Sequence, residues 1–261
     1  MSVLRMSEMS VNDVRKYLET NQTIVFPYGI VEQHGYHLPL STDIHNAEML
    51  SDIIAEGLGC MVAPTLNYCF SGGMLPGTIN VKPNHFSAFV VDIIESLTVQ
   101  GFRNIIIVPG HGGSESLENL RESLRIAKWM NPQLRETTVL LISFEDYSPL
   151  AHKAVFEDHD FHSGNLETSM MLAYRPDLVH MENLTMDPPD VAERLRQDPD
   201  SYQDRTYKTS LKEEIPSTKQ HADVQVGVMG HPELATAGFG QAVLDEFRKN
   251  IIPVLKKELC I

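Results

Sequence analysis

The sequence is short of cysteine, of basic residues and of long apolar runs, and each shortage excludes a class of protein. Its 261 residues include three cysteines, widely spaced and without a Cys-x-x-Cys pair, so neither a disulfide framework nor a thiolate zinc site is expected. Lysine and arginine number 21 against 35 acidic residues, which gives a formal net charge of −14. Nucleic acids and anionic membranes attract clustered cations, so neither is an expected partner.

Other absences narrow the choice further. No stretch approaches the ~18 consecutive apolar residues of a membrane span, and the first residues lack the apolar centre of a secretion signal, so we expect a cytoplasmic protein. There is no Gly-x-Ser-x-Gly elbow, P-loop or Gly-x-Gly-x-x-Gly fingerprint, which argues against a serine nucleophile and against nucleotide binding. Apolar residues make up 42% of the chain, and no repeat or long linker divides it, so we predict a single domain over residues 1–261.

Strand-like and helix-like segments alternate along the chain. The predicted strands are 23–27, 62–64, 105–108 and 137–144, and the predicted helices are 46–58, 85–100, 114–127, 165–174 and 239–258. This alternation predicts an α/β fold with a mostly parallel central sheet and helices on both faces. Residues 186–222 are polar instead, and we expect an insertion that is a solvated loop, a lid or a subunit contact.

The densest group of possible metal ligands lies within residues 32–45, directly after the first long strand. Glu32 and His34 are two residues apart, so their side chains point the same way if the chain stays extended. Asp43 can return to them after a turn at Leu38 and Pro39. Carboxylate and imidazole donors at a strand end suit a catalytic divalent metal.

His111 is a candidate for a further ligand from a second strand. It follows the predicted strand 105–108 within a glycine-rich turn, and flanking glycines let the backbone approach a metal or ligand closely. Because the carboxyl ends of parallel strands meet at one edge, we expect His111 beside Glu32 and His34. Taken alone, a histidine in such a turn is more often structural than a ligand.

Glu167 opens the predicted helix 165–174, where it either favours the helix N-terminus or supplies another carboxylate ligand. Two divalent ions bring four positive charges, which Glu32, Asp43, Glu167 and one hydroxide would balance. A single ion would leave buried carboxylates poorly compensated, so the charge count favours two metals with Asp43 or the hydroxide as the bridge. Zinc, manganese and ferrous iron all suit these donors.

Several motifs, in order over most of the chain, resemble the creatininase (creatinine amidohydrolase) family. They are Pro27-Tyr28-Gly29, Glu32-Gln33-His34-Gly35, His37-Leu38-Pro39-Leu40, Leu75-Pro76-Gly77-Thr78-Ile79, Gly110-His111-Gly112-Gly113, His162-Ser163-Gly164, Glu167-Thr168-Ser169 and Gly227-Val228-Met229-Gly230-His231-Pro232. The resemblance implies a single layered α/β domain with a binuclear metal centre. It also implies a homo-oligomer, commonly a hexamer.

The resemblance assigns roles to single residues. The implied metal ligands are Glu32, His34, Asp43, His111 and Glu167, with Asp43 as the bridge. His162 matches the histidine that moves protons in the family. We therefore predict a binuclear metal hydrolase that cuts a C–N bond of a small cyclic amide or formamide, with His162 delivering a proton to the leaving nitrogen. The predicted substrate contacts are His37, Ser71, Gly72, Gly112 and Gly113, and backbone amides around Ser71–Gly73 or Gly112–Gly113 are candidate oxyanion donors.

Two departures from the family argue against creatinine itself as the substrate. Creatininase has a glutamate ligand two residues after the histidine that His111 matches, and here that position is Gly113. The tryptophans of its pocket are missing too, because the single tryptophan, Trp129, falls on a predicted helix where we expect it to pack. Two alternatives stay open: a hydrolase of a C–C bond in a cyclic diketone, and a metal-binding scaffold without turnover.

Overall fold

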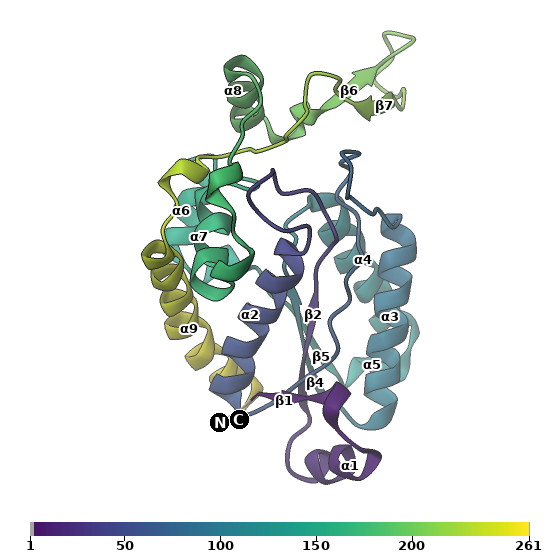
Figure 1. The fold of residues 1–261 in the computed structure, drawn as a ribbon. Helices are drawn as coiled ribbons and strands as arrows, with labels where there is room; N and C mark the ends of the chain where they lie inside the picture. The colour runs from purple at the N-terminus through teal and green to yellow at the C-terminus, as the bar shows by residue number, and fades with distance from the viewer. Residues whose placement is uncertain (1–2, 261) are drawn as a thin grey trace.

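A five-stranded parallel sheet forms the centre of the computed structural model, which describes residues 3–260 (Figure 1). Its strands stand in the order β1-β3-β2-β4-β5. They span Leu4–Arg5 (β1), Thr23–Tyr28 (β2), Met61–Val62 (β3), Asn104–Pro109 (β4) and Thr138–Leu141 (β5). The long central pair, β2 and β4, runs in register from Thr23 opposite Asn104 to Tyr28 opposite Pro109. The predicted fold class is therefore confirmed.

The apolar strand sequences divide between two cores, one on each face of the sheet. In β4, Ile106 and Val108 pack in one core, whereas Ile105 and Ile107 pack in the other. This alternation follows from the two-residue period of a strand. Because both faces are covered, a run of four apolar residues is tolerated without any exposed position.

Helices cover both faces of the sheet, as predicted (Figure 1). The first face carries α3 (Pro83–Gln100), α4 (Ser114–Met130) and the short α5 (Pro132–Arg135). The second face carries α2 (Thr42–Leu58), α6 (Pro149–Phe156), α7 (Asn165–Tyr174) and α9 (Ala237–Leu259). Helix α1 (Val11–Thr20) precedes β2, and its Tyr17 hydroxyl donates a hydrogen bond to the carbonyl of Thr23. Short 3₁₀ turns span Met6–Glu8, Phe144–Asp146, Pro176–Leu178, Met181–Asn183, Pro199–Tyr202 and Pro232–Leu234.

The polar segment 186–222 stands above the carboxyl edge of the sheet (top of Figure 1). It contains α8 (Pro189–Gln197) and an antiparallel hairpin of β6 (Gln203–Thr206) and β7 (Ser217–Gln220). A small separate core forms where Val191 and Leu195 of α8 meet Val224 and Met229. The segment is therefore attached to the body by its own apolar contacts.

Three local predictions need correction. The strand predicted at 137–144 ends at Leu141, because a 3₁₀ turn begins at Phe144. Helix α2 begins at Thr42, four residues earlier than predicted, so Asp43 lies in its first turn. Trp129 is 71% exposed and does not pack, because it lies on the side of α4 away from the inward-facing Leu120 and Leu124.

None of the helices within residues 3–260 combines the length and the apolar character that crossing a membrane requires. The expected homo-oligomer stays a prediction.

Candidate metal centre

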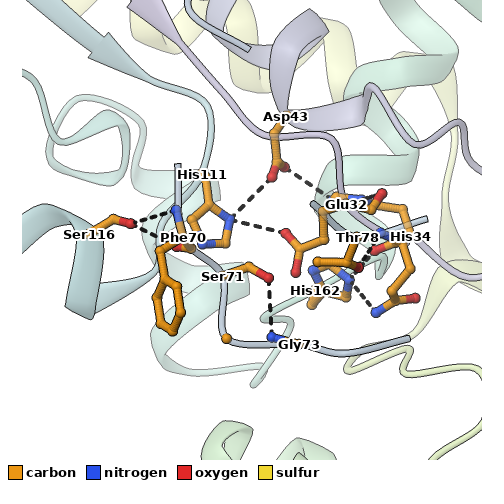
Figure 2. Close-up of polar contacts among 12 residues, drawn as sticks. Glu32, His34, Asp43, Phe70, Ser71, Gly73, Thr78, His111, Ser116 and His162 are labelled. Atoms are coloured by element: carbon orange, nitrogen blue, oxygen red, sulfur yellow. Dashed lines mark hydrogen bonds and ion pairs between the residues drawn. The ribbon is translucent and has the colours of Figure 1, made fainter. Parts of the chain in front are cut away.

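The predicted ligands converge at the carboxyl edge of the sheet. Figure 2 shows Glu32, His34, Asp43 and His111 of this group. Glu32 and His34 lie in the loop after β2, and His111 follows β4 directly. Asp43 and Glu167 lie in the first turns of α2 and α7. These are four separate elements, and the parallel register of β2 and β4 brings their strand ends side by side.

Asp43 stands between the two metal-facing histidines and offers one oxygen to each. Its Oδ1 lies 3.1 Å from Nε2 of His34, and its Oδ2 lies 3.1 Å from Nδ1 of His111 (Figure 2). A carboxylate that addresses two imidazoles through separate oxygens has the arrangement of a bridging ligand.

Each histidine also faces a second carboxylate. Nδ1 of His111 lies 3.2 Å from Oε2 of Glu32, and Nε2 of His34 lies 3.6 Å from Oε2 of Glu167. The donors thus form two triads that share Asp43, and the three ligand atoms of each triad lie within 4.8 Å of one another. Glu32 and His111 complete one triad, and His34 and Glu167 complete the other.

The burial of these groups fits metal ions. Glu32, His34 and Asp43 are buried, and neither Oε2 of Glu32 nor Nε2 of His34 forms a hydrogen bond with any residue in the range 3–260. Their short contacts, at 3.1 Å to Asp43 and 3.2 Å to His111, are with ionisable groups of the same cluster, so positive charge from protons or a bound cation is needed to offset the cost of burying them. The mixed oxygen and imidazole donors suit zinc or manganese.

Without a cation, the carboxylates act on protons instead. Burial by itself would lower the pKa of His34, but Asp43 and Glu167 outweigh it and hold that pKa well above 6.5. Glu32 and Asp43 do the same for His111. In return the histidines hold the pKa of Asp43 well below its ordinary value, although burial alone would raise it. Positive charge at both imidazoles is therefore favoured, as expected of a site that suits cations.

Neighbouring groups fix the orientation of both imidazoles. Nδ1 of His34 lies 3.2 Å from the carbonyl oxygen of Glu32, which places the proton on Nδ1 and leaves Nε2 for a metal. The ring of His111 lies over Gly113, and a Cβ at that position would come within 2.4 Å of its Nε2. Any side chain at position 113 would collide with this position of the ring.

His162 lies beside the ligands, with its ring 4.3 Å from the ring of His34 between centroids. Its Nε2 is 2.8 Å from the carbonyl oxygen of Gln33 and 3.0 Å from the side-chain Nε2 of the same residue. His162 also forms a third possible triad with Glu32 and His34. Its predicted role in proton transfer stays a prediction, since this position suits a metal ligand as well.

Two residues that support the site were missed by sequence reasoning. Gln33 turns its amide toward His162 because its Oε1 accepts a hydrogen bond from the amide of Gly35. Asp160 accepts hydrogen bonds from the amides of Asn165 and Leu166, at 2.8 and 2.6 Å, and so holds the start of the helix that carries Glu167. An aspartate shortly before a predicted helix is a capping signal that could have been noticed.

A cavity of about 550 Å³ opens onto the metal centre. Of the predicted substrate contacts, Ser71, Gly112 and Gly113 line it, but Gly72 and His37 do not. His37 is fully buried behind the site, where its Nε2 lies 3.0 Å from the hydroxyl of Thr168. Burial, reinforced by His34, lowers the pKa of His37 to about 4, so it stays neutral.

The amides of the 71–73 turn are not available as oxyanion donors. Those of Ser71 and Gly72 donate hydrogen bonds to Oδ1 of Asn80, and that of Gly73 donates to the hydroxyl of Ser71. The turn needs these bonds to hold its shape, including the positive φ of Gly72. Gly112 and Gly113 are left as the predicted donors that line the cavity.

Three known proteins that resemble this chain in sequence are named as hydrolases or peptidases. A creatinine amidohydrolase of Pseudomonas putida is 27% identical over 182 residues, which are 64% of this chain and 69% of that protein. A mycofactocin precursor peptide peptidase of Mycolicibacterium smegmatis is 27% identical over 231 residues (85% and 80% of the two chains). A 3-dehydro-scyllo-inosose hydrolase of Thermotoga maritima is 26% identical over 185 residues, covering 67% of this chain and 57% of its own length.

Solved structures share the fold. A creatininase described as a manganese form superposes with a TM-score of 0.75 at 21% identity, covering 98% of both chains. A variant creatininase described as a Zn-Zn type gives 0.74 at 21% identity, covering 99% of both chains. The family model described as creatinine amidohydrolase matches residues 7–255, which is nearly the whole chain. The chain therefore belongs to the creatininase family.

Proposed function

We propose that the chain is a hydrolase with two divalent metal ions that cuts the C–N bond of an amide in a polar substrate. The observation that carries the proposal is Asp43, which presents separate oxygens to His34 and His111 at 3.1 Å each. Creatinine amidohydrolase and the precursor peptide peptidase, which are named for the cleavage of amide or peptide bonds, support the choice of bond. The manganese and Zn-Zn forms of solved creatininases favour those two metals.

Different residues are proposed to bind the metal ions and to stabilise the developing negative charge. The ions would be held by two triads with Asp43 in common: Glu32, Asp43 and His111, and His34, Asp43 and Glu167. Ions bound in this way supply a water of lowered pKa and polarise the carbonyl of the substrate. Gly112 and Gly113 line the cavity, and their backbone amides are the proposed donors to the developing negative charge.

His162 is proposed to move the proton to the leaving nitrogen. The backbone carbonyl of Gln33 accepts a hydrogen bond from Nε2 when this atom is protonated, and the side-chain amide of Gln33 donates to it when it is not. Gln33 therefore offers Nε2 a hydrogen-bond partner in either protonation state of the ring. A general acid or base needs this tolerance of both states.

The test is His162→Ala, with His180→Ala as the matched control. His180 is largely exposed, and its side chain pairs with Glu182 away from the cavity. We expect His162→Ala to abolish turnover while its metal content stays at two ions per chain, and the control to keep both. Loss of metal from His162→Ala would show that His162 is a ligand and would refute its role in proton transfer.

A second candidate function is hydrolysis of a C–C bond in a cyclic ketone, which the relationship to 3-dehydro-scyllo-inosose hydrolase favours. Assays of the metal-loaded protein against lactams, formamides, peptides and cyclic diketones separate the two. Turnover of the ketones alone would reject cleavage of a C–N bond. Metal binding without any turnover would leave the scaffold alternative.

A further inference from the structure

The cavity extends well beyond the metal centre, along one side of α4. At about 550 Å³ it lies within the roughly 300–1,000 Å³ of sites that hold drug-sized molecules. Ser114, Leu117 and Arg121 of α4 line it, and their spacing of three and four residues places them on one face of the helix. The lining is more apolar than polar, and it includes Leu117, Phe156 and Phe161.

Arg121 is unusual among the residues that line the cavity, because none of the others is a lysine or arginine. Within residues 3–260 it forms no ion pair and no side-chain hydrogen bond. Arg125, one turn further along, instead pairs with Glu122 at 2.6 Å on the outer surface. In a chain of net charge −14, an arginine that faces a cavity without an acidic partner is available for a ligand.

The carboxylates of the cavity are engaged elsewhere. Those of Glu32 and Glu167 face the metal centre. Asp160 accepts hydrogen bonds from backbone amides, and Asp200 pairs with Arg205 at 3.1 Å. Glu115 and Glu145 accept hydrogen bonds from the hydroxyls of Ser114 and Ser143, at 3.4 and 3.1 Å, and keep their charge. None of the six carboxylates that line the cavity forms an ion pair with Arg121, so its guanidinium can pair with a molecule that enters the cavity.

We propose that the substrate is an elongated amide whose end remote from the metals carries a carboxylate, and that Arg121 binds this carboxylate. The proposal rests on the proposed function, which places the scissile bond at the metals. Arg121 lies seven residues beyond Ser114, about 10 Å along the helix axis. Its planar guanidinium can donate two parallel hydrogen bonds to a carboxylate. The apolar wall suits an aliphatic or aromatic segment between the two ends.

The test uses hydroxamic acids, which bind metals, extended by alkyl linkers of increasing length that end in a carboxylate or in the matching neutral carboxamide. Affinity for the zinc-loaded protein is measured by calorimetry, so the readout does not require turnover. We expect the acid to bind roughly tenfold more tightly than the carboxamide at one linker length. Arg121→Gln should remove this preference, and the matched variant Arg125→Gln should keep it.

The other outcomes are distinct. Equal affinity of acid and carboxamide at every length would overturn the role of Arg121 while leaving the metal centre intact. Tighter binding of amine-ended probes, lost in Glu145→Gln, would overturn it in favour of a cationic substrate. Failure of every hydroxamate to bind would reject the metal centre itself, and the carboxylate site would be rejected with it.

Discussion

Replacing Gly113 by alanine should weaken metal binding although position 113 is not a ligand. The new Cβ would lie 2.4 Å from Nε2 of His111, whereas ordinary van der Waals contact begins at 3.4 Å. The imidazole must therefore retreat by about 1 Å. The backbone itself accepts alanine, because Gly113 has a φ of −58° and a ψ of 122°. The whole effect should thus pass through the ring of His111.

The size of the effect follows from how closely a ligand must be held. Catalytic and metal-binding groups tolerate displacements of only about 0.5 Å, so a shift of about 1 Å disturbs the contacts of His111 with Asp43 and Glu32. Disturbing the support of a ligand typically costs about 10–100-fold in metal affinity, or about 1.4 to 2.7 kcal/mol. Stability without metal should change little, because position 113 is outside both main cores.

Competition of the protein with a chelator for zinc measures this affinity. The matched control is Gly112→Ala, since a Cβ at Gly112 meets no atom within 4 Å. We expect the control to bind zinc like the unmodified protein, and Gly113→Ala to lose at least one of its two ions at a chelator concentration that the control survives. Equal metal affinity for the two variants would refute His111 as a ligand held in this orientation.

Two further predictions concern protons and thiols. The facing carboxylates raise the pKa of His34 and of His111, so we expect both imidazoles to be protonated at neutral pH in the metal-free protein. Binding of metal ions should then release about two protons. Calorimetry in buffers of different ionisation enthalpy measures this release. Release of no proton on metal loading would refute the pairing. The raised pKa values also stabilise the metal-free protein below the unfolded pKa of about 6.5, and this stabilisation is lost as pH rises through the folded pKa values. The thermal unfolding temperature of the metal-free form should therefore fall at alkaline pH. Burial raises the pKa of Cys69 to about 11 and that of Cys60 to about 12, whereas Cys260 is exposed. A thiol reagent at pH 8 should therefore label one thiol rapidly in the native chain and three after unfolding. Rapid labelling of all three thiols in the native chain would contradict the burial of Cys60 and Cys69.

The convergence of the predicted ligands at the strand ends could be foreseen because it depends on local rules. Strands β2 and β4 are apolar runs, and residues directly after parallel strands meet at one edge, so Glu32 and His111 could be paired without any contact information. The position of Asp43 was less clear. Its helix begins with polar residues, so the spacing of apolar residues did not show where the helix starts. Ser41, directly before Thr42 and Asp43, is nevertheless a residue type that marks helix starts.

The supporting contacts could not be predicted, because they join loops that are distant in the sequence. Gln33 meets His162 across 129 positions, and Asp160 accepts a hydrogen bond from the amide of His231, 71 positions later. A loop has no period that fixes which side chain faces inward. The error at His37 has the same origin, since burial against Thr168 depends on how α7 packs behind the loop.

The shape of the cavity separates substrate choice from metal chemistry. The ligands lie at the sheet edge and in the first turns of α2 and α7, where the sheet and both apolar cores fix them. The wall beyond them comes from α4, from the end of α6, from the end of β5 with the turn after it, and from the segment above the sheet. A change such as Arg121→Gln alters that wall without touching a ligand. The proposed division of labour predicts that relatives named for hydrolysing creatinine, an inosose and a peptide keep the metal ligands and differ from this chain in the wall of the cavity.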